Sequence, residues 1–144
     1  MRAIVLAMAA LACAAAVGGC GGGITAPDLF IVQRTGSEAG ARLTLLVNEE
    51  GGVTCNGASK RYGRKLKVSD AALVEARAIQ EDLKDPASEH LSLPARPGSV
   101  LGYFVRDENG YVRFADNSPG QPKVLRQLAL FVLQTSQRVC GLQE

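Results

Sequence analysis

The chain opens with an apolar segment that we do not expect to be part of the folded domain. After Met1 and Arg2, residues 3–17 contain no charged side chain. This stretch of about 15 residues is shorter than the roughly 20 needed to span a bilayer, and its length is typical of an export signal. We therefore expect residues 1–19 to be a signal peptide that is removed on export, so that the fold is built from the rest of the chain.

The residues around Cys20 indicate how the exported chain is held. Val17, Gly18 and Gly19 precede Cys20, and this tetrapeptide resembles the lipobox of bacterial lipoproteins. The resemblance implies cleavage before Cys20 and acyl chains that hold the protein on the extracytoplasmic side of the cell membrane. The alternative is an ordinary secretory signal with a chance cysteine. Cys13 is a poorer candidate for lipidation, because no aliphatic residue lies three positions before it.

The mature chain is expected to be one tethered domain. Three glycines follow Cys20, so residues 20–27 read as a flexible tether, and residues 28–144 fit a single domain of ordinary size. Over the full sequence the charge is nearly balanced, with 16 Lys and Arg against 14 Asp and Glu. Export, and a single aromatic residue, Tyr62, near the basic residues at 60–67, argue against a nucleic-acid partner. No second apolar run approaches roughly 18 residues, so no other segment is expected to cross a membrane.

Two cysteines remain in the mature domain, Cys55 and Cys140. In an exported protein, an even pair far apart in sequence is most simply a disulfide. A zinc site is the weaker interpretation, because structural zinc usually takes four ligands and His90 is the only histidine. We therefore predict a Cys55–Cys140 disulfide, and we expect neither a metal nor a cofactor.

Hydrophobic patterning predicts an antiparallel sheet with helices on one face. Short runs of β-branched and aromatic residues between glycine-containing turns predict strands, and apolar residues at intervals of three and four predict two helices. Ser69 is the expected N-cap of the first helix, and Asp85 and Pro86 its end. The expected strands are 29–34, 42–48, 53–55 and two within 100–116, and the expected helices are 70–83 and 122–140. This ββ(β)αββα order is an α+β fold with four to five strands.

The segment 100–116 is the clearest hairpin, and its register can be chosen on physical grounds. A two-residue turn at Asn109 and Gly110 would place Arg106 opposite Arg113, and like charges directly opposed are unfavourable. A four-residue loop, 107–110, instead pairs Val105 with Val112 and gives the hairpin one apolar face. We predict the second register.

The sequence offers little support for catalysis. His90 lies in the polar segment "PASEHLSLP", and no nucleophile-elbow, phosphate-loop or dinucleotide-binding pattern occurs. A hydrolase that pairs His90 with Ser88, Ser92 or a carboxylate is the alternative, and it requires His90 to lie in a concave pocket. We predict that the protein is not an enzyme and has no catalytic residues.

A basic run follows the third expected strand. On a lipid-tethered domain such a run could contact anionic headgroups, at about 1 kcal/mol for each charge near the surface. The alternative is a solvated loop whose charge is balanced by Glu49, Glu50 and Asp70, which are nearby in sequence. The candidate contact residues are Lys60, Arg61, Arg64, Lys65 and Lys67.

Two resemblances bear on function. With its lipobox, its "DLFIVQRTGS" first strand and its two spaced cysteines, the chain resembles an uncharacterised family of bacterial lipoproteins. In "QRTGSEAGARLTL" and "YFVRDENGYVRFADNSPGQPKVLRQL" it is more remotely similar to emfourin-type inhibitors of thermolysin-like metalloproteases. That second resemblance implies a protease as partner and a loop that enters its cleft. The loop residues would be Thr35, Gly36, Ser37, Glu38, Ala39 and Gly40.

These observations lead to one expectation and two alternatives. We expect a membrane-anchored envelope lipoprotein with a small non-catalytic binding domain, with protease inhibition as its candidate activity. The alternatives are an envelope hydrolase that uses His90 and a purely structural envelope protein.

Overall fold

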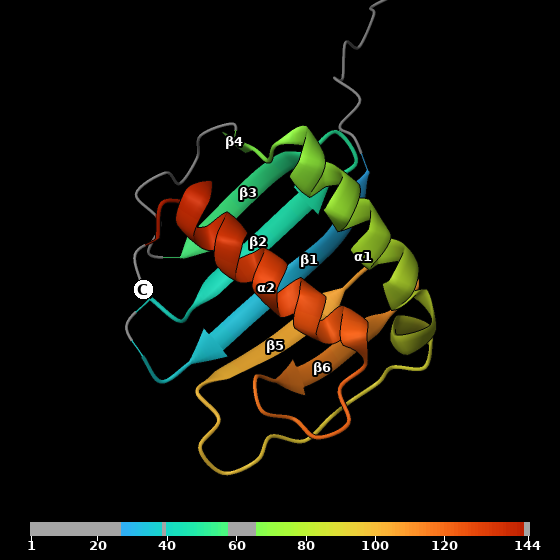
Figure 1. The fold of residues 1–144 in the computed structure, drawn as a ribbon, viewed down its shortest axis with the longest axis vertical. Coiled ribbons are helices and arrows are strands. Elements are labelled where there is room, and N and C mark those ends of the chain that lie inside the picture. Colours follow the sequence, from blue (N-terminus) through green and yellow to red (C-terminus); the bar gives the residue numbers. More distant parts are fainter. Residues whose placement is uncertain (1–26, 39, 58–65, 143–144) are drawn as a thin grey trace, which may run out of the picture.

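The computed structural model describes residues 27–38, 40–57 and 66–142. They form an α+β fold, with one antiparallel sheet of six strands and two helices. The strands are β1 (Asp28–Gly36), β2 (Leu43–Asn48), β3 (Gly52–Gly57), β4 (Leu66–Lys67), β5 (Leu101–Arg106) and β6 (Tyr111–Ala115). The helices are α1 (Asp70–Ser88) and α2 (Lys123–Arg138). Figure 1 shows β1 in the middle of the sheet, whose strand order is β4-β3-β2-β1-β5-β6.

The expected strand count of four to five was too low. The additional strand is β4, in which Lys67 pairs with Gly52 and Leu66 with Val53. Two residues are too few to show the alternation by which a strand is recognised in sequence. Pairing with β3, and not local propensity, creates this strand.

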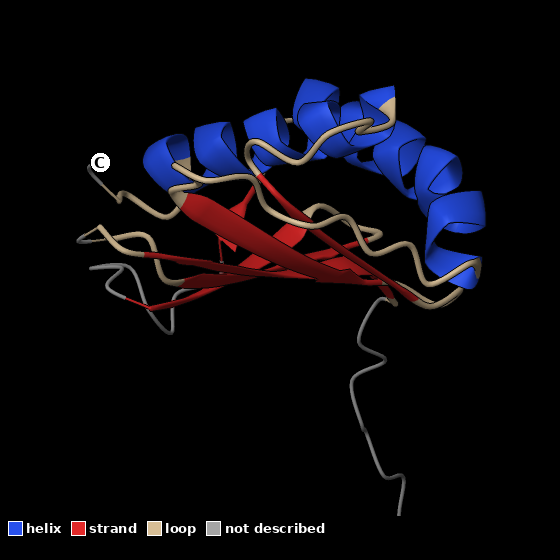
Figure 2. Ribbon diagram, turned by 90° about the horizontal axis from the view of Figure 1, so that it is seen from below, coloured by secondary structure: helices blue, strands red, loops and turns tan. Residues whose placement is uncertain are grey.

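Both helices cover the same face of the sheet (Figure 2). Along each strand the side chains alternate between this covered face and the opposite, open face. The core lies between the helices and the covered face, where the rings of Phe30 and Phe131 meet edge to face with centroids 5.9 Å apart. Its largest buried apolar side chains are Phe30, Phe131, Leu29, Leu45, Leu83, Leu125, Leu128, Val32, Val47, Val105 and Val112.

The predicted register of the β5–β6 hairpin is confirmed. Val105 pairs with Val112, and Arg106 pairs with Tyr111 instead of Arg113. The turn is held by Asp107, whose Oδ1 accepts hydrogen bonds from the backbone N–H groups of Asn109 and Gly110 at 2.8 and 3.0 Å. The avoided like-charge pair and the single apolar face therefore suffice to place this hairpin.

Helix α1 begins where expected and ends later. The hydroxyl oxygen of Ser69 accepts a hydrogen bond from the Ala72 N–H at 3.3 Å, which caps the helix. The prediction that Asp85 and Pro86 end the helix was wrong, because α1 continues to Ser88 with Pro86 inside it. The continuation buries Ala87 in the core. The tertiary packing of Ala87 therefore stabilises this last turn more than the intrahelical hydrogen bond missing at Pro86 destabilises it.

Asp116 fastens the segment before β5 to the end of β6. Its carboxylate accepts hydrogen bonds from the Ser99 hydroxyl at 2.7 Å and from the N–H groups of Val100 and Leu101 at 3.1 and 3.3 Å. Partial burial raises the pKa of Asp116, but the hydrogen bonds outweigh it and leave the pKa below the usual aspartate value.

Neither α1 nor α2 is long and apolar enough to cross a membrane.

Candidate functional site

Pro27, the first described residue, is held at one end of the sheet by a backbone hydrogen bond. The carbonyl oxygen of Pro27 accepts a hydrogen bond from the Glu49 N–H at 2.9 Å, which places the start of β1 beside the β2–β3 turn. The β5–β6 turn lies at the same end, because Ile31 pairs with Arg106. We call this the attachment end. Cys20, the expected signal peptide 1–19 and residues 20–26 of the expected tether lie outside the described residues.

The loop predicted to bind a partner lies at the opposite end of the sheet. Nine residues of β1 separate the two ends, about 30 Å at the rise of a strand. Thr35 and Gly36 belong to β1, where they pair with Gly102 and Leu101, so the loop is shorter than predicted. Ser37 and Glu38 are exposed, and Ala39 lies outside the described residues.

Arg34 holds the far side of this loop. Its side chain is on the covered face and only 2% exposed. Its Nε donates to the Ala41 carbonyl oxygen at 2.9 Å, and its Nη2 donates to the Gly40 carbonyl oxygen at 3.1 Å. The sequence reading gave Arg34 no role. The sequence pattern nevertheless indicates a buried cation. Every second residue of this strand faces the core, and Arg34 follows Phe30 and Val32 in that series.

The predicted disulfide is confirmed. Cys55 of β3 and Cys140, two residues beyond α2, are bonded, with their Cα atoms 5.9 Å apart. Both residues are buried. The bond fastens the C-terminal end of α2 to the sheet near its β3–β4 edge.

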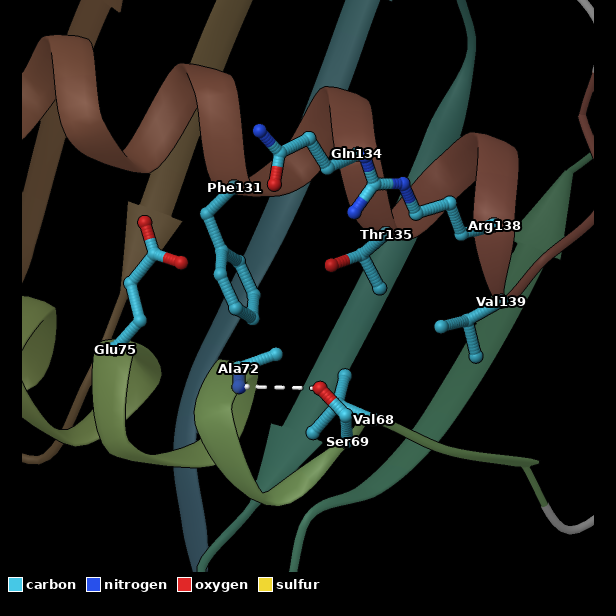
Figure 3. A pocket seen from close by; sticks show the side chains of 9 residues that line it. All are labelled: Val68, Ser69, Ala72, Glu75, Phe131, Gln134, Thr135, Arg138 and Val139. Carbon is cyan, nitrogen blue, oxygen red and sulfur yellow. Dashed lines mark hydrogen bonds between the residues drawn. The ribbon is translucent and has the colours of Figure 1, made fainter.

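A groove of about 310 Å³ lies between the N-terminal half of α1 and the C-terminal half of α2 (Figure 3). Phe131 and Ala72 contribute apolar surface, while Glu75 comes from α1 and Gln134 and Arg138 come from α2. The sequence reading missed this groove, because the separation of two helices is set by packing and leaves no local pattern. The complete lining is Val68, Ser69, Ala72, Glu75, Phe131, Gln134, Thr135, Arg138 and Val139.

A second, more open hollow of about 370 Å³ lies near the predicted partner-binding loop. Gln33, Thr44 and Asn56 line it from three adjacent strands, and Thr35 and Arg42 complete its polar rim. Lys67, on β4, is exposed near the attachment end, since its partner Gly52 begins β3. The other four residues of the basic run, Lys60, Arg61, Arg64 and Lys65, lie outside the described residues.

His90 is exposed and packs against an aromatic ring. Its backbone has φ 52°, and its ring stacks on Tyr111 with centroids 4.5 Å apart. It lines neither of the two cavities above. The Ser88 hydroxyl donates to the Asp85 carbonyl oxygen, and Ser92 forms an isolated bridge with Arg113. Across the described ranges, no three His, Cys, Asp or Glu residues are grouped closely enough to hold a metal ion.

Comparison of the chain with protein-family models, with curated proteins and with solved structures finds no match.

Proposed function

We propose that this protein is an exported lipoprotein, held on the membrane through Cys20, whose domain is a non-catalytic binding module. The observation that carries the proposal is the position of Pro27, where the described chain begins, relative to Ser37 and Glu38 of the predicted partner-binding loop. Pro27 lies at the attachment end, and the loop lies one full strand away from it. A domain held by its N-terminus therefore presents this loop away from the membrane.

Tether length and redox chemistry support the same arrangement. Residues 20–27 span at most about 28 Å when fully extended, so the domain stays close to the bilayer while the loop stands about 30 Å beyond the attachment end. The Cys55–Cys140 bond suits an oxidising compartment outside the cytoplasm. His90 stacks on Tyr111 and the Ser88 hydroxyl donates to the Asp85 carbonyl oxygen, so the described structure does not pair His90 with Ser88, as one form of the hydrolase alternative requires.

Protease inhibition is the candidate activity, and the hydrogen bonds of Arg34 favour it. A loop that enters a protease cleft binds more tightly when it is ordered beforehand, because less conformational freedom is lost on binding. Arg34 provides such order by holding the Gly40 and Ala41 carbonyl groups from inside the core.

Replacing the proposed lipid-bearing cysteine tests the attachment. We expect Cys20→Ser to move the protein from the membrane fraction to the soluble fraction, or to leave an uncut precursor, because serine has no thiol to form the thioether to a diacylglyceryl group. Cys13→Ser is the matched control and is expected to leave processing and fractionation unchanged. Fractionation and intact mass of the product measure both outcomes. A fully processed, membrane-held Cys20→Ser protein would contradict the proposal.

Inhibition of a thermolysin-like metalloprotease tests the candidate activity. We expect the purified chain to inhibit thermolysin, and Ser37→Arg together with Glu38→Arg to raise the inhibition constant at least tenfold, about 1.4 kcal/mol. The new side chains would change the size and charge of the exposed loop. Glu81→Arg, on the exposed side of α1, is the control and is expected to have no effect. Inhibition that the loop variant leaves intact would exclude this loop as the binding element.

A further inference from the structure

The open face of the sheet carries a continuous lane of side chains that the proposed function does not use. Strand pairing aligns Asn56 with Thr44, Thr44 with Gln33, Gln33 with Phe104, and Phe104 with Arg113. These five residues cross five adjacent strands on the face that no helix covers (Figure 2). At about 4.8 Å between strands, the lane is about 19 Å long.

An arginine is held in place at the β6 end of the lane. The guanidinium carbon of Arg113 lies 4.9 Å from the ring centroid of Phe104 and 5.6 Å from that of Tyr111. Tyr111 is supported in turn by the stacked ring of His90. Stacking on aromatic rings orients a guanidinium while its N–H groups remain available for an anion. The two aromatic rings therefore hold the guanidinium group of Arg113 in place.

A second arginine is placed close to the first. Arg106 pairs with Tyr111 and Arg113 pairs with Phe104, so the two arginines occupy a diagonal of the β5–β6 ladder, where side chains are roughly 7 to 8 Å apart. Within the described residues, neither arginine forms an ion pair. The nearby carboxylate of Asp107 already accepts hydrogen bonds from its own turn. Neither cation is therefore paired in a salt bridge with a carboxylate that the structure describes.

The opposite end of the lane is the polar hollow of about 370 Å³, with exposed Arg42 at its rim. Gln33, Thr44 and Asn56 offer both donors and acceptors. No hydrogen bond within the described part of the chain occupies these three side chains. The lane thus has cations at both ends and neutral hydrogen-bonding groups between them.

The charge of the strand positions on the open face is consistent with an anionic ligand. The open-face strand positions that carry charge are Lys67, Arg106 and Arg113, with Asp28 as the single acid of the described strands, at the start of β1. Amide and hydroxyl groups that both donate and accept match a hydroxyl-rich molecule, and arginines match its carboxylates. We propose that the open face binds a carboxylate-bearing polysaccharide, which lies across the strands between Arg42 and Arg113.

Two other anionic partners fit the face less well. An acidic peptide that added a strand at the β6 edge would meet residues 91–93, since the Leu93 N–H already donates to the Arg113 carbonyl oxygen and the Arg113 N–H to that of Leu91. An anionic bilayer would approach the attachment end, where among the described residues the carboxylates of Glu49, Glu50, Asp107 and Glu108 outnumber the cations Lys67 and Arg106.

The test uses the full chain in detergent and an oligomer of galacturonic acid as the probe. Calorimetric titration is expected to show binding that weakens as salt is raised and that is absent for neutral dextran. Arg42→Gln with Arg113→Gln is expected to weaken it at least tenfold. Lys84→Gln with Lys123→Gln removes the same charge from the two helices and is expected to change the affinity less than twofold. Circular dichroism checks that both variants are folded.

Several outcomes would overturn the inference. These are the absence of oligogalacturonate binding, equal affinity for dextran, equal or tighter binding of poly-glutamate, tighter binding of vesicles that contain phosphatidylglycerol, and an unaffected Arg42→Gln/Arg113→Gln variant. The inference can fail while the proposed function stands, because neither arginine lies in the exposed loop 37–38 or near Cys20. Membrane fractionation should therefore be unchanged in this double variant, so that a failure of the inference leaves the proposed membrane attachment intact.

Discussion

Replacing both members of the Cys55–Cys140 disulfide by alanine is expected to lower the free energy of unfolding by about 4 to 5 kcal/mol. The cysteines are 85 residues apart, so the bond removes much of the freedom of the unfolded chain in the chain-entropy model. A domain of this size is typically stable by about 5 to 15 kcal/mol, so the loss is a large share of the total. Alanine is chosen because both sites are buried. Urea denaturation with equilibrium fits gives the value.

The native protein under reducing conditions is the matched control for this variant. If the covalent link carries the effect, the reduced protein and the double alanine variant should have similar urea midpoints, both well below that of the oxidised protein. The oxidised and reduced curves would coincide if the bond contributed nothing. That result would contradict the expectation, and so would a loss below about 1 kcal/mol.

The sequence was sufficient for those parts of the fold that local patterns determine. The β5–β6 register followed from the charges of Arg106 and Arg113, and the start of α1 followed from the capping side chain of Ser69. The disulfide followed from the expectation of export and from the number of cysteines. In each case the prediction rests on the type and spacing of nearby residues or on the expected export to an oxidising compartment. None of the three requires knowledge of which distant segments become neighbours.

The parts that could not be predicted depend on which segments become neighbours. The lane on the open face exists because β1 lies between β2 and β5, which places Gln33 beside Phe104. Residues 33 and 104 are far apart in the chain, and patterning predicts which face each occupies but not which strand lies next to it. The extension of α1 past Pro86 has the same kind of cause, because Ala87 is buried by tertiary packing.

Arg34 provides the second large effect. We expect Arg34→Ala to lower the free energy of unfolding by about 3 to 5 kcal/mol, because the Gly40 and Ala41 carbonyl groups lose a charged donor, at about 1 to 3 kcal/mol each, and the buried stem loses its packing. Thermal or urea denaturation measures the loss. Arg42→Ala is the control, since Arg42 is exposed and its removal is expected to change stability by less than about 0.5 kcal/mol.

The Arg34→Lys variant separates the role of the guanidinium from that of its charge. The substitution keeps the charge, but a single ammonium group cannot reproduce the two directed bonds from Nε and Nη2. We therefore expect Arg34→Lys to fold, with faster amide hydrogen exchange at Ala41, whose N–H donates to the Glu38 carbonyl oxygen at 3.2 Å. If the loop acts as an ordered inhibitory element, thermolysin inhibition should weaken in parallel. Unchanged exchange at Ala41 in this variant would mean that the loop keeps its order without the guanidinium, and the preorganisation argument would then fail.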